Sequence, residues 1–331
     1  MPPSSLETPR LRLRRWREAD RAPFAAMNAD PAVMEFFPKR LSRDESDALV
    51  DRIEATFERE DLGLWAVEDR ATGAFEGFVG LNPVPGEIPC APAVEIGWRL
   101  RREAWGRGLA TEGGRAVLAD AFERCGLHRV VSFTSTTNVR SQGVMRALGL
   151  AHREEDDFDH PRVEAGPLRR HVLFRLDSIS WRVQQLPFLR PAGRADRPFL
   201  QPLRRDAYHD LMVASYGRFE EETDRRQEQA QWDGAGLSVL VEGGRDLGVL
   251  QLAESDEGIE IREIQIRPDA QNAGHGTRLL RRVAEVAHAR GVDVVLRTPL
   301  KNAGARRLYE RLGFRRTHSD DTHDHLRWSS R

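Results

Sequence analysis

The chain has 331 residues, of which 40% are hydrophobic and 31% are charged, and its formal net charge is −1. This length suffices for about two domains, and the balanced charge disfavours DNA, RNA and anionic lipid as partners. Cys90 and Cys125 form no CxxC pair, which indicates separate thiols rather than a disulfide framework. Without an apolar leader or a membrane-length apolar run, the sequence predicts a soluble cytoplasmic protein.

The first half opens with a predicted strand, Pro9–Trp16, in which leucines alternate with arginines that we expect to stay in water. A nucleic-acid arm is the alternative, which the lack of interleaved aromatics and of net positive charge disfavours. One or two helices should follow, from Asp20 to about Glu60. There Ser42 and Glu45 have the spacing of a capping box.

Shorter patterns complete the first half. A hairpin is predicted for LWAVED and AFEGFVGL, a loop for PVPGEIPCAP, and a strand for AVEIGWRL. A turn and a long helix are predicted for WGRGLATEGGRAVLADAFERCG, then a strand for HRVVSFTS, a helix for NVRSQGVMRALG and a strand for LRRHVLFRLD. The order is β, α, ββ, β-turn-α, β, α, ββ.

After Asp177 the periodicity fades, and SISWRVQQLP shows no clear helix or strand. We therefore predict two domains, residues 1–177 and 188–331, with a linker at residues 178–187. The second half repeats the element order, with a helical region at Asp206–Trp232. The same features recur at a nearly constant offset, which is 166 residues from Trp105 to Gln271, 164 from Asn138 to Asn302 and 164 from Gly149 to Gly313. A repeat this long indicates two whole domains.

Each half contains a glycine-rich turn between a strand and a helix, WGRGLA at Trp105–Ala110 and QNAGHG at Gln271–Gly276. Such a turn lets several N–H groups point outward beside the positive end of the helix, which attracts phosphate. Ordinary turn glycine is the alternative for either hexapeptide alone. Their recurrence favours a site for a phosphorylated ligand.

With these motifs, each half resembles a GCN5-related N-acetyltransferase (GNAT) domain, a family that depends on acyl-coenzyme A. The family's pyrophosphate motif, Q/R-x-x-G-x-G/A, is matched by Gln271, Gly274 and Gly276, and by Gly108 and Ala110 with Trp105 in the first slot. An Asn before a helix that ends in Y-x-x-x-G-F is matched by Asn302, Tyr309, Gly313 and Phe314. The segments TPRLRLRRW, EIGW, WGRGLATE and N-x-x-S make the first half similar to the branch of ribosomal-protein N-terminal acetyltransferases (RimJ/RimL-like), where Trp in the first slot is usual.

The resemblance implies an α/β (α+β) fold with two tandem domains. Each would have a mixed, mostly antiparallel sheet flanked by helices and a V-shaped acyl-CoA cleft between its central strands. It also implies acetyl-CoA as co-substrate and no metal. The implied acetyl-CoA-binding residues are Trp105, Gly106, Arg107, Gly108, Leu109, Ala110 and Asn138 in the first half, and Gln271, Asn272, Ala273, Gly274, His275, Gly276 and Asn302 in the second.

Acetyl transfer to an amine needs a base, because an alkylammonium has no nucleophilic lone pair. The candidates are Glu263 and Glu95. Aligned on the glycine turns, Glu95 falls opposite Ile261, two residues from Glu263, so strand alternation puts both carboxylates on the same side. Each glutamate has a structural alternative, an ion pair with a neighbouring arginine such as Arg262 or Arg99.

The departing thiolate needs an acid or a stabilising group. Tyr309 is the candidate in the second half, and a core aromatic is its structural alternative. Met145 stands at the corresponding place in the first half, and its thioether has no proton to give. Ser141 is the weaker substitute there. Capping of their helices is an equal alternative for Asn138 and Asn302, and this role does not exclude contact with the cofactor.

Two charged segments remain. HSDDTHDH, His318–His325, has metal-binding residue types without a known ligand spacing, so we expect a wet hairpin loop instead. FEEETDRRQEQ, Phe219–Gln229, is predicted to be a solvated helical face. If it borders the acceptor groove, Glu220–Glu222 would favour a cationic amine.

The sequence therefore predicts an N-acetyltransferase that transfers acetyl from acetyl-CoA to a primary amine. Neither motif contains a cysteine, so we expect direct attack in a ternary complex. The acceptor would be a small-molecule amine, a protein N-terminus or a lysine, and the protein a monomer or homodimer without nucleic-acid or membrane partners. The alternative is a non-catalytic acyl-CoA-binding sensor or scaffold with a degenerate first domain.

Overall fold

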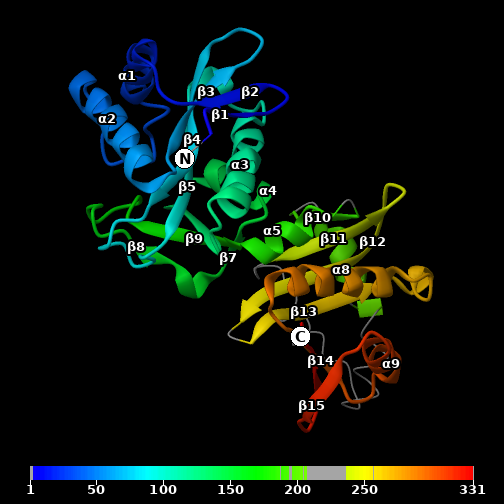
Figure 1. Ribbon diagram of the computed structural model, residues 1–331. Coiled ribbons are helices and arrows are strands. Elements are labelled where there is room, and N and C mark those ends of the chain that lie inside the picture. The colour runs from blue at the N-terminus through cyan, green and yellow to red at the C-terminus, as the bar shows by residue number, and fades with distance from the viewer. Residues whose placement is uncertain are drawn as a thin grey trace. The chain divides into compact units, whose positions relative to one another are not determined.

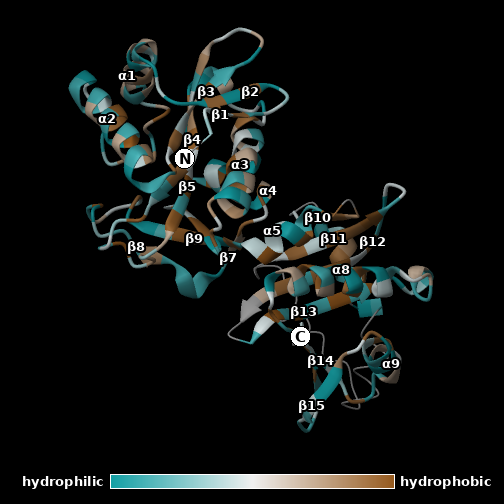
Figure 2. Ribbon diagram, viewed as in Figure 1, coloured by the Kyte–Doolittle hydropathy of each residue, from teal (hydrophilic) through white to brown (hydrophobic). Residues whose placement is uncertain are grey.

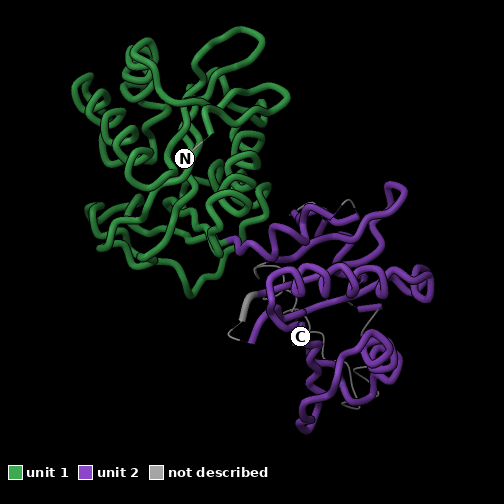
Figure 3. Tube along the Cα trace, in the orientation of Figure 1, with its two compact units in different colours: residues 1–175 green, residues 176–331 purple. Residues whose placement is uncertain are grey.

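The computed structural model divides into two compact units, residues 1–175 and 176–331 (Figure 3). We describe each unit by itself. The described residues are 3–186, 188–193, 196–203, 205–206, 236–255 and 257–330. Within them, no helix is long and apolar enough to cross a membrane.

The first unit contains a nine-stranded mixed sheet, with the path β1-β2-β3-β4-β5-β6-β9-β7 and with β8 paired to β9. Neighbours from β1 to β5 are antiparallel, and β5 and β6 are parallel. Its strands are β1 (Ser5–Glu7), β2 (Leu11–Arg14), β3 (Leu64–Asp69), β4 (Phe75–Pro83), β5 (Val94–Leu100), β6 (Arg129–Ser135), β7 (Ala151–His152), β8 (Phe158–Asp159) and β9 (Arg170–Asp177). Its main helices are α1 (Arg21–Ala29), α2 (Arg43–Glu60), α3 (Leu109–Ala119) and α4 (Val139–Ala147).

Helices cover both faces of this sheet (Figure 1). Phe78 of β4 packs edge to face on Phe24 of α1, with ring centroids 6.1 Å apart. The next residue, Val79, faces the opposite side, where a Cβ added to Gly113 of α3 would lie 3.4 Å from its Cγ2. Thus α1 packs on one face of the central strands and α3 on the other.

Local signals in the sequence have clear counterparts in α2 and β2. Ser42 accepts the N–H of Glu45 at 3.2 Å, and Glu45 accepts the N–H of Ser42 at 2.8 Å, so the predicted capping box is confirmed. Figure 2 shows hydrophobic and hydrophilic residues on different sides of α2. The prediction that the arginines of the first strand stay wet is wrong for Arg14. Its side chain is buried because Asp20 and Glu68 each pair with it at 2.7 Å.

The second unit contains a seven-stranded sheet in the order β10-β11-β12-β13-β14-β16-β15. Only β13 and β14 are parallel among its described pairs. Its strands are β10 (Leu189–Pro191), β11 (Leu237–Glu242), β12 (Arg245–Ser255), β13 (Gly258–Ile266), β14 (Val294–Pro299), β15 (Arg315–Ser319) and β16 (His323–Trp328), and its described helices include α5 (Ser178–Gln184), α8 (His275–Arg290) and α9 (Ala303–Arg311). Both units therefore have the mixed sheets flanked by helices that the sequence predicts.

Two sequence predictions of structure need comment here. The prediction that residues 178–187 lack regular structure is wrong, because α5 occupies most of them. Its Ile179 and Val183 belong to the core of the second unit. The predicted helical region Asp206–Trp232, which includes Phe219–Gln229, lies outside the described residues except for Asp206.

Candidate active site

In each unit the two central parallel strands are paired near one end only. In the first, Glu95 of β5 pairs with Val131 of β6. In the second, Ile259–Ile261 of β13 pairs with β14. No further pair joins these strands among the described residues, so a wedge opens in each sheet. This arrangement agrees with the V predicted between the central strands.

A glycine in the left-handed conformation begins the helix beside each wedge. Gly108, with φ +76°, precedes α3, and Gly274, with φ +86°, precedes α8. Neither helix has a side-chain cap, and a Cβ added to Gly274 would meet nothing within 4 Å. No capping side chain therefore bonds the N–H groups in the first turn of either helix. These groups are suited to bind a ligand, and the helix dipole favours an anionic one.

Trp105 and Gln271 make the same hydrogen bond in the two units. Nε1 of Trp105 donates to the carbonyl of Leu100 at 2.9 Å, and Nε2 of Gln271 donates to the carbonyl of Ile266 at 3.0 Å. Each acceptor is the last residue of the preceding strand. The indole N–H thus reproduces the contact of the amide, which explains how Trp can fill the first slot of the turn.

The other residues of the turns differ in exposure. In the first unit, all of Trp105–Ala110 except Arg107 line the cavity described below. The side chain of Arg107 instead pairs with Asp69 at 3.1 Å and with Glu76 at 3.5 Å. In the second unit, residues 271–274 are exposed, His275 is half-buried and Gly276 is buried.

Asn138 and Asn302 begin α4 and α9 with nearly the same backbone angles, φ −83° and ψ 69° against φ −84° and ψ 64°. Oδ1 of Asn138 accepts the N–H of Ser141 at 3.1 Å, and Oδ1 of Asn302 accepts that of Ala305 at 3.1 Å. The capping interpretation of both asparagines is therefore confirmed.

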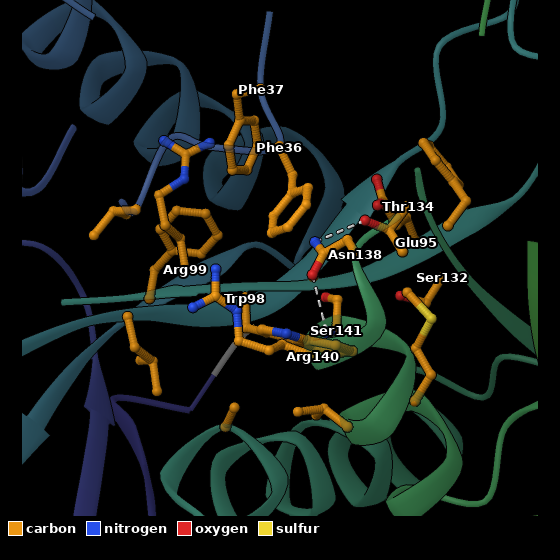
Figure 4. Close-up of a pocket in the computed structure, with 18 of the residues that line it drawn as sticks. Phe36, Phe37, Glu95, Trp98, Arg99, Ser132, Thr134, Asn138, Arg140 and Ser141 are labelled. Atoms are coloured by element: carbon orange, nitrogen blue, oxygen red, sulfur yellow. Dashed lines mark hydrogen bonds between the residues drawn. The ribbon is translucent and has the colours of Figure 1, made fainter. Parts of the chain in front are cut away.

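A cavity of about 920 Å³ lies in the first unit. It reaches from the turn before α3 to Glu95, Ser141 and the segment between α1 and α2. Figure 4 shows Glu95, Asn138 and Ser141 on one side of the labelled group and Arg99 with Phe37 on the other. Most of the predicted site residues of the first half therefore share one cavity.

The side chain of Glu95 makes no hydrogen bond or ion pair with any described residue. Burial raises the pKa of its carboxyl to about 8. The alternative of an ion pair with Arg99 is wrong, because Nη1 of Arg99 donates to Oδ1 of Asn28 at 2.7 Å instead. Glu95 is thus a titratable group without a structural partner among the described residues, a common property of functional carboxyls.

Glu263 is placed by a bulge in β13. It pairs with Gln251, whereas Ile261 pairs with the adjacent Leu252, so Ile261 and Glu263 point to opposite faces. The prediction that Ile261 and Glu263 share a face is therefore wrong. Arg262, the extra residue, pairs with Glu260 at 2.9 Å.

Tyr309 and Met145, which stand at corresponding positions in the two halves, are both buried. Tyr309 is 6% exposed, and burial together with the nearby carboxylate of Glu263 raises the pKa of its phenol. Its ring also packs on Phe314, 5.8 Å away between centroids, so a core role and a site role coincide. In the first unit, Met145 is 1% exposed and lines the cavity with Ser141.

The structure adds cavity residues that the sequence analysis does not identify as site residues. Arg99 lies two positions past Gly97 and four past Glu95 on β5, so strand alternation places all three on one face. The spacing of Glu95 and Arg99 in the sequence could therefore have identified Arg99 as a candidate site residue. His160 and His171, which approach each other at 4.8 Å between ring centroids, come from separate segments that carry no motif.

His318–His325 forms the expected hairpin, with β15 and β16 on either side of a short turn. His325 pairs with Asp320 at 2.9 Å. Among the described residues, no group of three or more His, Cys, Asp or Glu side chains is arranged to hold a metal ion.

Comparison with known sequences agrees with this geometry. A model described as "Acetyltransferase (GNAT) domain" matches residues 10–151, and one described as "Acetyltransferase (GNAT) family" matches residues 204–314. The chain belongs to the GNAT family. Membership makes it an N-acetyltransferase with two tandem GNAT domains, as the sequence motifs predict.

Two relatives and one solved structure illustrate the similarity. FsC-acetyl coenzyme A-N(2)-transacetylase of Aspergillus fumigatus is 32% identical over 179 residues, which cover 51% of this chain and 75% of that protein. YkkB of Bacillus subtilis is 29% identical over 148 residues, 44% of this chain and 85% of that protein. The ribosomal-protein-S5-alanine acetyltransferase structure from Vibrio fischeri is 18% identical with a TM-score of 0.44, and covers 54% of this chain and 98% of that chain.

Proposed function

We propose that the protein transfers the acetyl group of acetyl-CoA to a primary amine by direct attack within a ternary complex. One observation carries this proposal: a single cavity of about 920 Å³ joins the uncapped start of α3 to Glu95. This observation supports a pyrophosphate site and a proton acceptor within one space.

In the first GNAT domain, the N–H groups of the turn before α3 bind the pyrophosphate, and the open edge of β5 offers an N–H to the thioester carbonyl. Glu95 accepts a proton from the ammonium, so the nitrogen lone pair can form a bond to the carbonyl carbon. The C–S bond then breaks, and the second proton of the attacking nitrogen passes to the departing thiolate. Ser141, held at the start of α4 with Asn138, donates a hydrogen bond to the departing thiolate.

In the second GNAT domain, Glu263 takes the role of base and Tyr309 that of acid. The raised pKa of the Tyr309 phenol keeps its proton in place until a thiolate develops beside it. The Gln271–Gly276 turn holds the cofactor. The neighbouring Arg262 pairs with Glu260 at 2.9 Å.

The test is the release of free coenzyme A from acetyl-CoA with a panel of primary amines. Gly108→Glu and Gly274→Glu each place a side chain and a negative charge in one turn, so each variant isolates the other domain. We expect Glu95→Gln to lower kcat of the first domain and Tyr309→Phe that of the second, each by about 10²-fold. Full activity of both variants would contradict the roles assigned to Glu95 and Tyr309. An acetylated enzyme formed without amine would contradict direct attack.

A specific observation favours a second candidate for the first domain alone. Met145 occupies the place of Tyr309, so this domain lacks the phenol. In this second candidate function, the first domain binds acetyl-CoA as a sensor without turnover. Gly274→Glu decides between the two: a variant that binds coenzyme A and turns over no amine supports the sensor, and measurable turnover supports the enzyme.

A further inference from the structure

Arg99 is a half-buried cation without an anionic partner among the described residues. Its Nη1 donates to Asn28 at 2.7 Å, and its guanidinium lies over the ring of Phe37 at 4.0 Å and that of Phe78 at 5.5 Å. Asn28 is itself fully buried and donates to Ser46 at 2.8 Å. The side chain is therefore held in one place by neutral groups.

The Nε donor of Arg99 is not used within the described structure. Its Nε is buried and has no hydrogen-bond partner among the described residues. The other two arginines that line the cavity are paired, Arg140 with Glu35 at 2.7 Å and Arg162 with Glu87. A buried charge left unpaired is costly, so the missing partner is most simply supplied by a ligand.

The position of Arg99 assigns this partner to the acceptor rather than to the cofactor. Arg99 pairs across the sheet with Phe78, on the face that packs against α1. Trp98 pairs with Val79, on the face of α3. The helix N-terminus that suits the pyrophosphate thus belongs to the opposite face of the sheet from Arg99.

The charges of the cavity favour an anion there. Burial lowers the pKa of Arg99 to about 10, so the guanidinium stays charged near neutral pH. Glu95 is the only carboxyl side chain among the lining residues, and its pKa of about 8 keeps it largely protonated there. A guanidinium fork matches a carboxylate in geometry as well as in charge.

We propose that Arg99 binds a carboxylate on the acceptor, so that the first domain acetylates primary amines that carry a carboxyl group. This inference rests on the proposed function. Glu95 and Arg99 stand four residues apart, about 13 Å between Cα atoms at the usual strand rise. Gly97 between them has no side chain to fill the space. The amine and the carboxylate should therefore be several bonds apart, as in an ω-amino acid or a short peptide.

The second domain provides an internal comparison. Gln265 stands 166 residues after Arg99, the offset of the two turns, and its buried Nε2 also lacks a hydrogen-bond partner among the described residues. Both domains thus present an unused donor at this position, but only the first presents a cation. Arg99→Gln gives the first domain the residue of the second.

The test uses the full chain with Gly274→Glu and compares ε-aminocaproate with its neutral amide, ε-aminocaproamide. We expect kcat/KM to favour the acid by about ten-fold or more. Arg99→Gln should remove this preference by slowing only the acid, Arg99→Lys should restore part of it, and Arg162→Gln should keep it. Equal use of acid and amide, or an equal loss for both, would overturn the proposal.

Two further measurements separate this proposal from the proposed function. If neither amine is turned over, calorimetry of ε-aminocaproate with the coenzyme A-loaded protein decides. Binding of the acid but not the amide, lost in Arg99→Gln, supports the carboxylate site, and no binding of the acid overturns it. If Arg99→Gln instead weakens coenzyme A itself, the anion belongs to the cofactor and the proposal is wrong.

Discussion

At the scale of single residues, the ionisation of Glu95 makes a prediction about pH. A base must be deprotonated to accept a proton, so the activity of the first domain should rise with pH and level off above about 8. The measurement is kcat/KM in the Gly274→Glu background with an acceptor whose own pKa lies well below this range. Glu95→Gln should lose the inflection, and an inflection that persists would assign it to another group.

The same carboxyl makes a prediction about stability. Its folded-state pKa of about 8 lies above the ordinary 4.5, so between these values the folded state holds a proton that the unfolded state has released. Stability from this group is therefore lost as pH rises through that window. Urea unfolding should show the wild type losing up to a few kcal/mol relative to Glu95→Gln over this window. Glu123→Gln, at an exposed site, is the control.

Trp105 offers a third prediction, because its ring serves two contacts. Its N–H donates to Leu100, and its face lies 4.3 Å from the guanidinium of Arg140. Trp105→Phe keeps a ring and loses the donor, whereas Trp105→Gln keeps a donor of the kind that Gln271 uses. We expect the first to weaken coenzyme A binding in the first domain by about five-fold and the second to weaken it less. Calorimetry in the Gly274→Glu background measures both, and the reverse order would show that the aromatic contact matters more.

At the scale of elements, α5 shows how capping stabilises one unit. Oδ1 of Asp177 accepts the N–H groups of Ile179 at 3.1 Å and Ser180 at 2.7 Å. Asp177→Ala should therefore cost the second unit about 1 kcal/mol, and more than it costs the first unit, in which Asp177 ends β9. Ser42→Ala, at the cap of α2, is the matched variant for the first unit. Thermal unfolding, followed by hydrogen exchange in each unit, would separate the effects of the two variants. An equal effect of either variant on both units would contradict the prediction.

Elements with strong local signals were predictable and those set by pairing were not. The capping box of α2 and the capping asparagines of α4 and α9 follow from short-range hydrogen bonds that a few residues encode. The bulge at Arg262 depends on the register with β12, which no local pattern carries. Helix α5 is short, and its apolar residues read as helical only against the core that they enter.

At the scale of the whole molecule, the glycine turns were predictable from the sequence, whereas the role of Arg99 was not. The turns were predictable because a glycine at positive φ beside a helix start is a local feature, and both turns have it. The sequence indicates Arg99 only as a possible ion-pair partner of Glu95, because no pattern in it shows that Asn28 accepts a hydrogen bond from the guanidinium. Residues that act through distant contacts need the fold before their chemistry is visible.

Duplication of the whole domain leads to a prediction about stoichiometry. The two turns share their left-handed glycine, their uncapped helix and their side-chain contact to the preceding strand. We therefore expect two coenzyme A molecules to bind per chain in calorimetry. Gly108→Glu and Gly274→Glu should each leave one site, because a side chain at positive φ strains the turn and its carboxylate repels the pyrophosphate. The double variant should bind none, and one molecule bound by wild type would mean that only the turn whose variant abolishes binding is a site.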